Sequence, residues 1–199
     1  MTSTIRPAQA RPARGSARAT ALAGGLHPIG VLVLLAGAFM PIMDFFITNV
    51  ALPSISGSLH ASGAELELVI AGYGVAYAAL LVLGGRLGDR YGRRPVFLGA
   101  LVGFTLASLA CGLAPSAGFL IGARIVQGGA AALLIPQVLA TFHHTLEGER
   151  KARALALYGA TSGIAAVIGQ IVGGLLVSAN IDGSSWRPIF LVKIGRAHV

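Results

Sequence analysis

The sequence predicts an all-α membrane protein with five complete transmembrane helices and the start of a sixth. Hydrophobic residues make up 55% of the 199-residue chain and charged residues only 11%, whereas a soluble domain carries about 25% charged residues. The apolar runs between the charges have the length of membrane spans, which need about 20 residues each. Basic residues gather in short segments between these runs. Buried helices of a soluble protein are disfavoured, because too few polar residues remain to cover them.

The first element is a basic tail, residues 1–27, which contains several arginines and no acidic residue. A signal or transit peptide is the alternative for such a segment. Pro7 and Pro12 break an amphipathic helix, and the apolar run that follows is too long for the core of a signal peptide. We therefore expect a disordered tail in the cytoplasm.

The transmembrane bundle follows from runs with little or no charge. The first run contains a single charged residue, Asp44, and the sequence LAPSAG divides a longer uncharged run into the third and fourth spans. The last complete span is glycine-rich and uncharged. The bundle is expected to fill residues 28–193, with spans at about 28–52, 66–85, 95–113, 118–142 and 154–178 and a sixth span that begins at Pro188.

The distribution of Lys and Arg predicts the orientation. The tail and the segments 86–94 and 143–153 hold nearly all of the basic residues, and successive spans bring these three segments to the same side. The connections on the opposite side contribute only Arg187. Because basic loops stay in the cytoplasm, we expect a multi-pass protein of the plasma (inner) membrane, embedded in the lipid bilayer, with its N-terminus inside.

The stretch GGRLGDRYGRRP, residues 84–95, places five charges between two uncharged runs. Glycines permit a tight turn, and a carboxylate near the start of a helix can face its free N–H groups. The stretch closely resembles the signature loop between the second and third helices of the major facilitator superfamily. The resemblance implies a gating loop in the cytoplasm, with matching residues Gly85, Asp89, Arg90, Gly92, Arg93 and Arg94.

Four further stretches resemble the drug–proton antiporters of that superfamily. MDFFITNVALPSI (43–55) is similar to their first-helix motif and indicates the fourteen-helix multidrug efflux branch. RIVQGGAAALLIPQ (124–137) resembles the fourth-helix motif, and SWRPIFLVK (185–193) resembles the start of the sixth helix. GATSGIAAVIGQIVGGLL (159–176) resembles the glycine-rich antiporter motif of the fifth helix. The resemblance implies the N-terminal, six-helix half of the major facilitator fold.

The fifth-helix stretch departs from the family where Gln170 replaces the usual proline, so we expect a straighter helix. Gly159, Gly163, Ala166, Gln170 and Gly173 fall on one helical face at steps of three and four residues, and small residues permit close helix packing. The predicted packing residues of this helix are Gly159, Gly163, Gly169, Gln170, Gly173 and Gly174.

The last six residues, IGRAHV (194–199), depart from the family altogether. They do not continue a membrane helix, and they match the translation of a common sequencing-adapter sequence. We therefore expect a non-native tail here and a natural protein that continues, because an incomplete sixth span cannot seal the bundle. The expected partner of the bundle is the missing C-terminal half of the same protein.

Asp44 and Arg124 are the charges well inside the predicted spans. Each costs about 2.5–3.5 kcal/mol near the middle of the bilayer, so we expect them to pair, directly or through water. The first and fourth helices of the superfamily line its central cavity. The pair either only stabilises the bundle or couples protons to transport, with Asp44 as the proton carrier and Arg124 as its regulator. Thr48, Asn49 and Gln127 are the other predicted cavity residues.

Several functional classes are disfavoured. The sequence lacks a nucleophile–base set, an H-E-x-x-H motif and a phosphate loop, so no enzyme is predicted. His143 and His144 are adjacent without further ligands nearby, and we predict no metal site. The basic residues do not form one face of a polar domain, which argues against nucleic-acid binding. No cofactor is expected, because a proton gradient would supply the energy.

The leading hypothesis is secondary active transport: a proton-coupled antiporter that exports small hydrophobic or cationic compounds. The alternative is another facilitator of the superfamily, a uniporter or symporter for sugars or metabolites. The signature stretch fits both, whereas the fifth-helix motif and the combination of Arg124 with Gln127 favour antiport.

Overall fold

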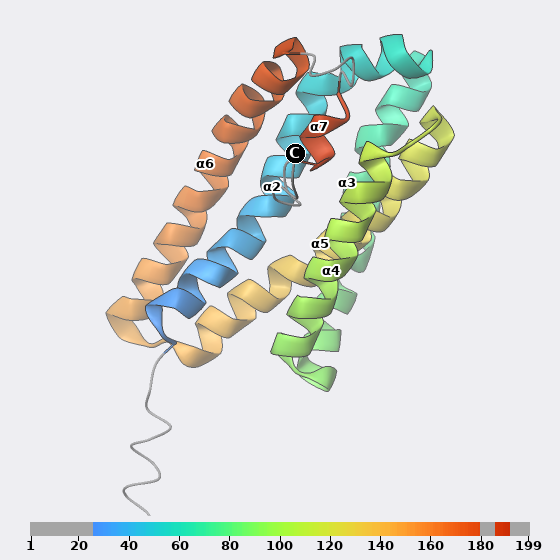
Figure 1. Ribbon diagram of the computed structural model, residues 1–199. Helices are drawn as coiled ribbons and strands as arrows, with labels where there is room; N and C mark the ends of the chain where they lie inside the picture. Colours follow the sequence, from blue (N-terminus) through green and yellow to red (C-terminus); the bar gives the residue numbers. More distant parts are fainter. Residues whose placement is uncertain (1–25, 180–185, 192–199) are drawn as a thin grey trace, which may run out of the picture.

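The computed structural model describes residues 26–179 and 186–191, and in these residues all regular structure is helical (Figure 1). Five helices are long and apolar enough to cross a membrane, which confirms the predicted all-α membrane class. Most of the basic tail and the terminal residues 194–199 lie outside the described residues. The helices are α2 (Pro28–Leu59), α3 (Gly63–Tyr91), α4 (Arg93–Gly112), α5 (Ala117–Thr145), α6 (Gly148–Ala179) and the single turn α7 (Pro188–Leu191).

Side-chain caps fix where the helices begin. At the start of α3, Ser62 Oγ accepts a hydrogen bond from the Glu65 backbone N–H at 3.4 Å, and Glu65 Oε2 accepts one from the Ser62 N–H at 2.8 Å. This reciprocal capping box places Glu65 in the first helical turn, so the helix begins three residues before the expected span of about 66–85. Ser116 caps α5 in a similar way, with its Oγ 3.3 Å from the Phe119 nitrogen.

The connection between α3 and α4 is shorter than predicted. Instead of a turn over 86–94, α3 continues to Tyr91 and α4 begins at Arg93, so Gly92 is the single non-helical residue between them. Gly92 has a φ of +92°, a conformation that favours glycine because it has no Cβ. One glycine therefore reverses the chain, and the charges on either side of it are carried on helical turns.

Glycines bring α3 and α5 into direct backbone contact. A Cβ atom placed on Gly128 would lie 2.2 Å from the carbonyl oxygen of Tyr73, and one on Gly84 would lie 2.3 Å from that of Ala132. These contacts follow each other in the same order along both helices, so α3 and α5 run in parallel. The small residues thus allow a close approach that any larger residue would prevent.

The bundle consists of two groups of packed helices. α3 and α4 both pack along α5, and α2 packs along α6 (Figure 1). In the second group, Gly169 of α6 lies against the backbone of Met43, and Gly173 lies against Ile47. The direct contact between α2 and α5 is much less extensive, and it lies where the two groups meet.

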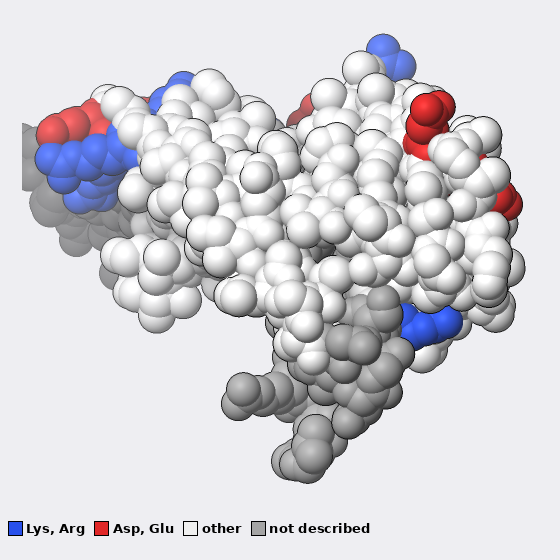
Figure 2. Space-filling view, turned by 90° about the horizontal axis from the view of Figure 1, so that it is seen from above, with Lys and Arg blue, Asp and Glu red and all other residues white. Residues whose placement is uncertain are grey.

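Charged side chains are segregated to the ends of the helices. The start of α2, the α3–α4 connection and the α5–α6 connection lie at one end of the bundle, at the bottom of Figure 1, and they carry most of the described basic residues. Seen from the opposite end, the molecule is white over most of its surface, with charged side chains at the margins (Figure 2). This distribution is typical of a protein whose middle is surrounded by lipid.

Candidate functional site

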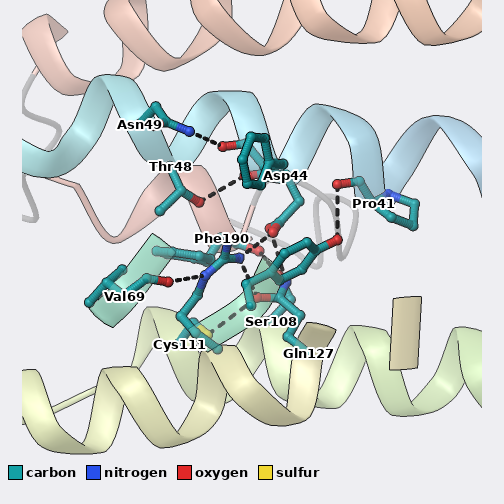
Figure 3. Close-up of polar contacts among 12 residues, drawn as sticks. Pro41, Asp44, Thr48, Asn49, Val69, Ser108, Cys111, Gln127 and Phe190 are labelled. Carbon is teal, nitrogen blue, oxygen red and sulfur yellow. Dashed lines mark hydrogen bonds and ion pairs between the residues drawn. The ribbon is translucent and has the colours of Figure 1, made fainter. Parts of the chain in front are cut away.

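A buried polar network joins α2 to α5 where the two groups of helices meet (Figure 3). Asp44, Arg124 and Gln127 are all fully buried. Arg124 Nη1 donates to Asp44 Oδ2 in a direct ion pair and also to Gln127 Oε1 at 2.8 Å. Gln127 Nε2 donates to Asp44 Oδ1 at 2.9 Å. The predicted pairing of the two intramembrane charges is therefore direct, and Gln127 closes a three-membered network.

Helix geometry explains why these side chains meet. Arg124 and Gln127 are three residues apart, so they lie on the same face of α5. The adjacent Gly128 brings the backbone of α3 close, and Arg124 Nε donates to the carbonyl oxygen of Val69 in that helix at 3.3 Å. The arginine thus links three helices, and its charge is fixed in one orientation.

Two aromatic rings complete the surroundings of the arginine. The Arg124 Cζ atom lies 4.2 Å from the ring centroid of Tyr73 and 6.0 Å from that of Phe190. A cation over an aromatic face is stabilised by the ring quadrupole, more strongly where water is excluded. Neither residue was predicted to belong to the site, because an aromatic residue in an apolar span is usually part of the hydrophobic core. The motif residue Gly128 was the available signal, since it marks where α3 approaches.

Thr48 and Asn49 are not part of the network. Thr48 Oγ1 donates to the Asp44 backbone carbonyl at 2.8 Å, and Asn49 Nδ2 donates to that of Phe45 at 2.7 Å. Both bonds stay within α2, and Asn49 is exposed. Thr48 therefore supports the helical turn that carries Asp44, while a role for either side chain in a cavity stays a prediction.

Two glycines of the signature stretch that were not among the predicted gating residues, Gly84 and Gly88, pack against α5. An added Cβ on Gly85 would meet open space, whereas Gly84 and Gly88, four residues apart, face α5. Gln137 Nε2 donates to the Gly84 carbonyl oxygen at 2.7 Å, and the Gln137 side chain leaves no room for a Cβ on Gly88. Because α3 remains helical here, its contact face includes 84 and 88 and excludes 85.

The charged residues of this stretch make several separate contacts at the end of the bundle. Asp89 was expected near free N–H groups at a helix start; its Oδ1 instead lies 3.5 Å from Arg93 Nη2, and its side chain is 71% exposed. Arg93 Nη1 donates to the Ala140 carbonyl of α5 at 2.6 Å. Arg90 lies over the ring of Tyr91, and Arg94 lines an apolar pocket beside α2. The gating role of these residues stays a prediction.

Only part of the predicted α6 packing face contacts the described helices. Gly169 and Gly173 pack on α2, and Ala165, one turn before Gly169, is buried. No atom of another described helix lies within 4 Å of a Cβ added to Gly159, Gly163 or Gly174, and Gln170 is exposed. The face that contacts α2 is therefore rotated from the predicted one, and packing at the other four positions stays a prediction.

An apolar pocket of about 300 Å³ lies next to the network, between α2, α3 and α5. Its wall is rich in aromatic rings, and one of them is the Tyr73 ring that contacts Arg124. In the residues that the structure describes, no group of three His, Cys, Asp or Glu side chains is placed to hold a metal ion. The main lining side chains are Pro41, Phe45, Phe46, Tyr73, Tyr77 and Ile135.

Comparison with known proteins gives relatives whose names describe a transporter, a resistance protein and an efflux pump. A "Probable actinorhodin transporter" of Streptomyces coelicolor is 40% identical over 81% of this chain and 28% of its own length. A "Methylenomycin A resistance protein" of the same species is 38% identical over 90% of this chain and 38% of its own length. The "Drug efflux pump JefA" of Mycobacterium tuberculosis is 38% identical over 82% of this chain and 32% of its own length. The chain thus spans about a third of the length of these relatives.

The family profile described as Major Facilitator Superfamily matches residues 34–195, which include all five long helices except the first residues of α2. This match agrees with the helical architecture and with the relatives, and members of this family are transporters. The chain is a multi-pass membrane protein that belongs to the major facilitator superfamily.

Proposed function

We propose that this chain, together with a second helical half, exports small hydrophobic or cationic compounds across the plasma membrane in exchange for protons. The observation that carries the proposal is the buried ion pair of Asp44 and Arg124, which joins two groups of helices beside an aromatic pocket. The names of the relatives, a probable actinorhodin transporter, a methylenomycin A resistance protein and a drug efflux pump, support the substrate class.

Asp44 is the proton carrier in this proposal. A guanidinium stays charged at physiological pH, so of the two partners only the carboxylate can bind and release a proton. When Asp44 is neutral, Arg124 keeps its bonds to Gln127 and to the Val69 carbonyl but loses its counter-charge. Because the pair lies where α2 meets α5, a change in its charge alters the contact between the two groups of helices.

The aromatic pocket suits an apolar substrate or an organic cation. Its lining exposes almost no polar surface, so it offers few hydrogen bonds and favours compounds that are recognised by shape and by ring contacts. Aromatic rings also attract cations through their faces. Sugars need several polar partners, which this lining does not provide, and the proposal therefore favours export of drug-like compounds over the sugar symporter alternative.

The orientation that we propose places the N-terminus and the α3–α4 connection in the cytoplasm. Single cysteines at positions 60 and 90 of a Cys111→Ala background test this orientation. His60 lies between α2 and α3, and Arg90 lies in the last turn of α3, so the two positions are at opposite ends of this helix. We expect a membrane-impermeant thiol reagent to label position 60 in intact cells and position 90 only after permeabilisation. Labelling in the reverse order contradicts the orientation.

The proposed coupling predicts the effect of Asp44→Asn in the full-length transporter. Asparagine preserves the hydrogen-bonding shape but cannot carry a proton at physiological pH, so efflux driven uphill by an imposed pH gradient should be abolished, while downhill exchange persists. The measurement is drug efflux from proteoliposomes that contain equal amounts of folded protein.

A matched control for this experiment is Glu67→Gln, which makes the same chemical change at an exposed position near the start of α3. It should pump like the wild type. If Asp44→Asn pumps uphill with the wild-type dependence on pH, the ion pair only stabilises the bundle, and the proposed coupling is wrong.

A further inference from the structure

We propose that Tyr73 couples the aromatic pocket to the buried polar network. When an aromatic or flat apolar group binds in the pocket, it weakens the binding of the proton to Asp44 through the Tyr73 ring. Tyr73 is a positioning residue in this inference, because it changes how Arg124 pairs with Asp44 and carries no proton itself. The inference rests on the proposed function and names the element by which substrate and proton compete.

Tyr73 touches both the pocket and the network. Its ring forms part of the pocket wall, and its centroid lies 4.2 Å from the Arg124 Cζ atom. Its neighbours in the wall include Phe45, whose ring centroid lies 6.0 Å away, and Tyr77, one turn along α3. A ligand that enters the pocket therefore meets the same ring on which the guanidinium rests.

The position of Tyr73 is tightly defined. Its backbone packs directly against Gly128, and the whole residue is only 5% exposed. The hydroxyl donates to the Pro41 carbonyl oxygen at 3.1 Å, one turn before Asp44 in α2. Tyr73 thus connects α3 to the turn of α2 that precedes Asp44. A small displacement of its ring changes its contacts with both Arg124 and α2.

The surroundings of Asp44 favour this route for the coupling. Among the described residues, Arg124 of α5 forms an ion pair with Asp44, and Tyr73 of α3 interacts electrostatically with both of them. The Cys111 Sγ of α4 donates to Gln127 Oε1 at 3.5 Å. α6 presents Gly169 next to Met43, and α7 presents the Phe190 ring to Arg124. The Arg124 guanidinium therefore links the Tyr73 ring of the pocket to the Asp44 carboxylate.

The direction of the effect follows from electrostatics. The π-face of Tyr73 and the carboxylate of Asp44 both attract the guanidinium of Arg124, so the two interactions compete. A bound ring that shifts Tyr73 away from the guanidinium strengthens the pairing of Arg124 with the ionised carboxylate, so binding of the compound should release a proton. By linkage, the proton must weaken binding of the compound to the same extent, which is the competition that an antiporter requires.

The experiment measures proton-linked binding to the purified full-length transporter, with tetraphenylphosphonium as the aromatic cationic probe. For the wild type we expect proton release on binding and a Kd that falls by up to about tenfold per pH unit as pH rises through the titration of Asp44. Tyr73→Leu should still bind the probe but show a Kd that is nearly independent of pH. Tyr73→Phe, which keeps the ring, should restore most of the dependence.

Two comparisons separate coupling from loss of packing. Tyr77→Leu removes another ring of the pocket and should weaken binding while preserving the pH dependence. Pentafluorophenylalanine at position 73 keeps the shape of phenylalanine but removes the electron-rich face, so its Kd should be flatter with pH than that of Tyr73→Phe; this pair serves even where Tyr73→Leu does not fold.

The outcomes distinguish this inference from the proposed function. A wild-type protein that binds the probe without releasing protons contradicts the proposed antiport itself. A wild type that is proton-linked, with Tyr73→Leu or the fluorinated residue retaining the full pH dependence, overturns the role of Tyr73 alone. Equal loss of pH dependence in Tyr77→Leu also overturns it, because the pocket would then act without a specific ring.

Discussion

Replacement of Arg124 by methionine is expected to lower the free energy of unfolding of the full-length transporter by about 3–5 kcal/mol, the usual cost of leaving one partner of a buried ion pair alone. Asp44 is fully buried, and of its two side-chain partners in the network it would keep only the amide of Gln127. The loss should shrink as pH falls, because protonation removes the buried negative charge of Asp44, and the folded state then binds more protons than the unfolded state. Thermal unfolding in detergent at several pH values measures this.

The double variant Asp44→Asn/Arg124→Met is the control. It removes both charges, and the side-chain oxygen of the introduced asparagine can still accept from Gln127 Nε2, so most of the stability should return. Uphill efflux should remain absent in both variants, because neither has the ionisable pair. A single variant as stable as the wild type at neutral pH would show that Asp44 is neutral in the folded protein, and the ion pair would then have no role.

Gly128→Ala is the second change with a large expected effect. The new Cβ would lie 2.2 Å from the Tyr73 carbonyl oxygen and 2.9 Å from its Cα, and backbone atoms cannot rotate away as a side chain can. The α3–α5 contact must open, at a cost of about 3 kcal/mol, near the upper end of the range for overpacking. Proton-coupled efflux should fall with it, because the Tyr73 ring and the Val69 carbonyl move away from Arg124.

Gly122→Ala is the matched control on the same helix. An added Cβ there has no neighbour within 4 Å, and alanine is favoured over glycine in a helix by about 1 kcal/mol. We expect unchanged or slightly higher thermal stability and normal efflux. If Gly128→Ala behaves like Gly122→Ala, the close approach of α3 and α5 is not needed for the site.

The sequence was sufficient for the features that depend on local composition. The lengths of the apolar runs predicted five membrane helices, and α7 begins at Pro188, as expected. The cost of a lone charge in lipid predicted that Asp44 and Arg124 would pair. Gln127 was identified through the family motif, and its place three residues after Arg124 accounts for its part in the network.

The features that depend on neighbouring helices could not be predicted. Which glycine of the signature stretch packs on α5 depends on helical phase, and α3 continued through a segment that its charges and glycines marked as a turn. Tyr73 carries no local signal, because its role comes from a ring contact with Arg124, a residue two helices further along the chain. Only a structure shows which aromatic residue of a span lies against a buried cation.

The one-residue connection at Gly92 limits how α3 and α4 can move. Consecutive Cα atoms are about 3.8 Å apart, so the end of α3 and the start of α4 cannot separate by sliding, whereas the four residues from Leu113 to Ser116 leave slack between α4 and α5. The relative motion of α3 and α4 is thereby restricted to rotation about Gly92. Arg93 follows Gly92 directly, and its guanidinium donates to the Ala140 carbonyl of α5. This contact with α5 can therefore persist while the other ends of α3 and α4 move apart.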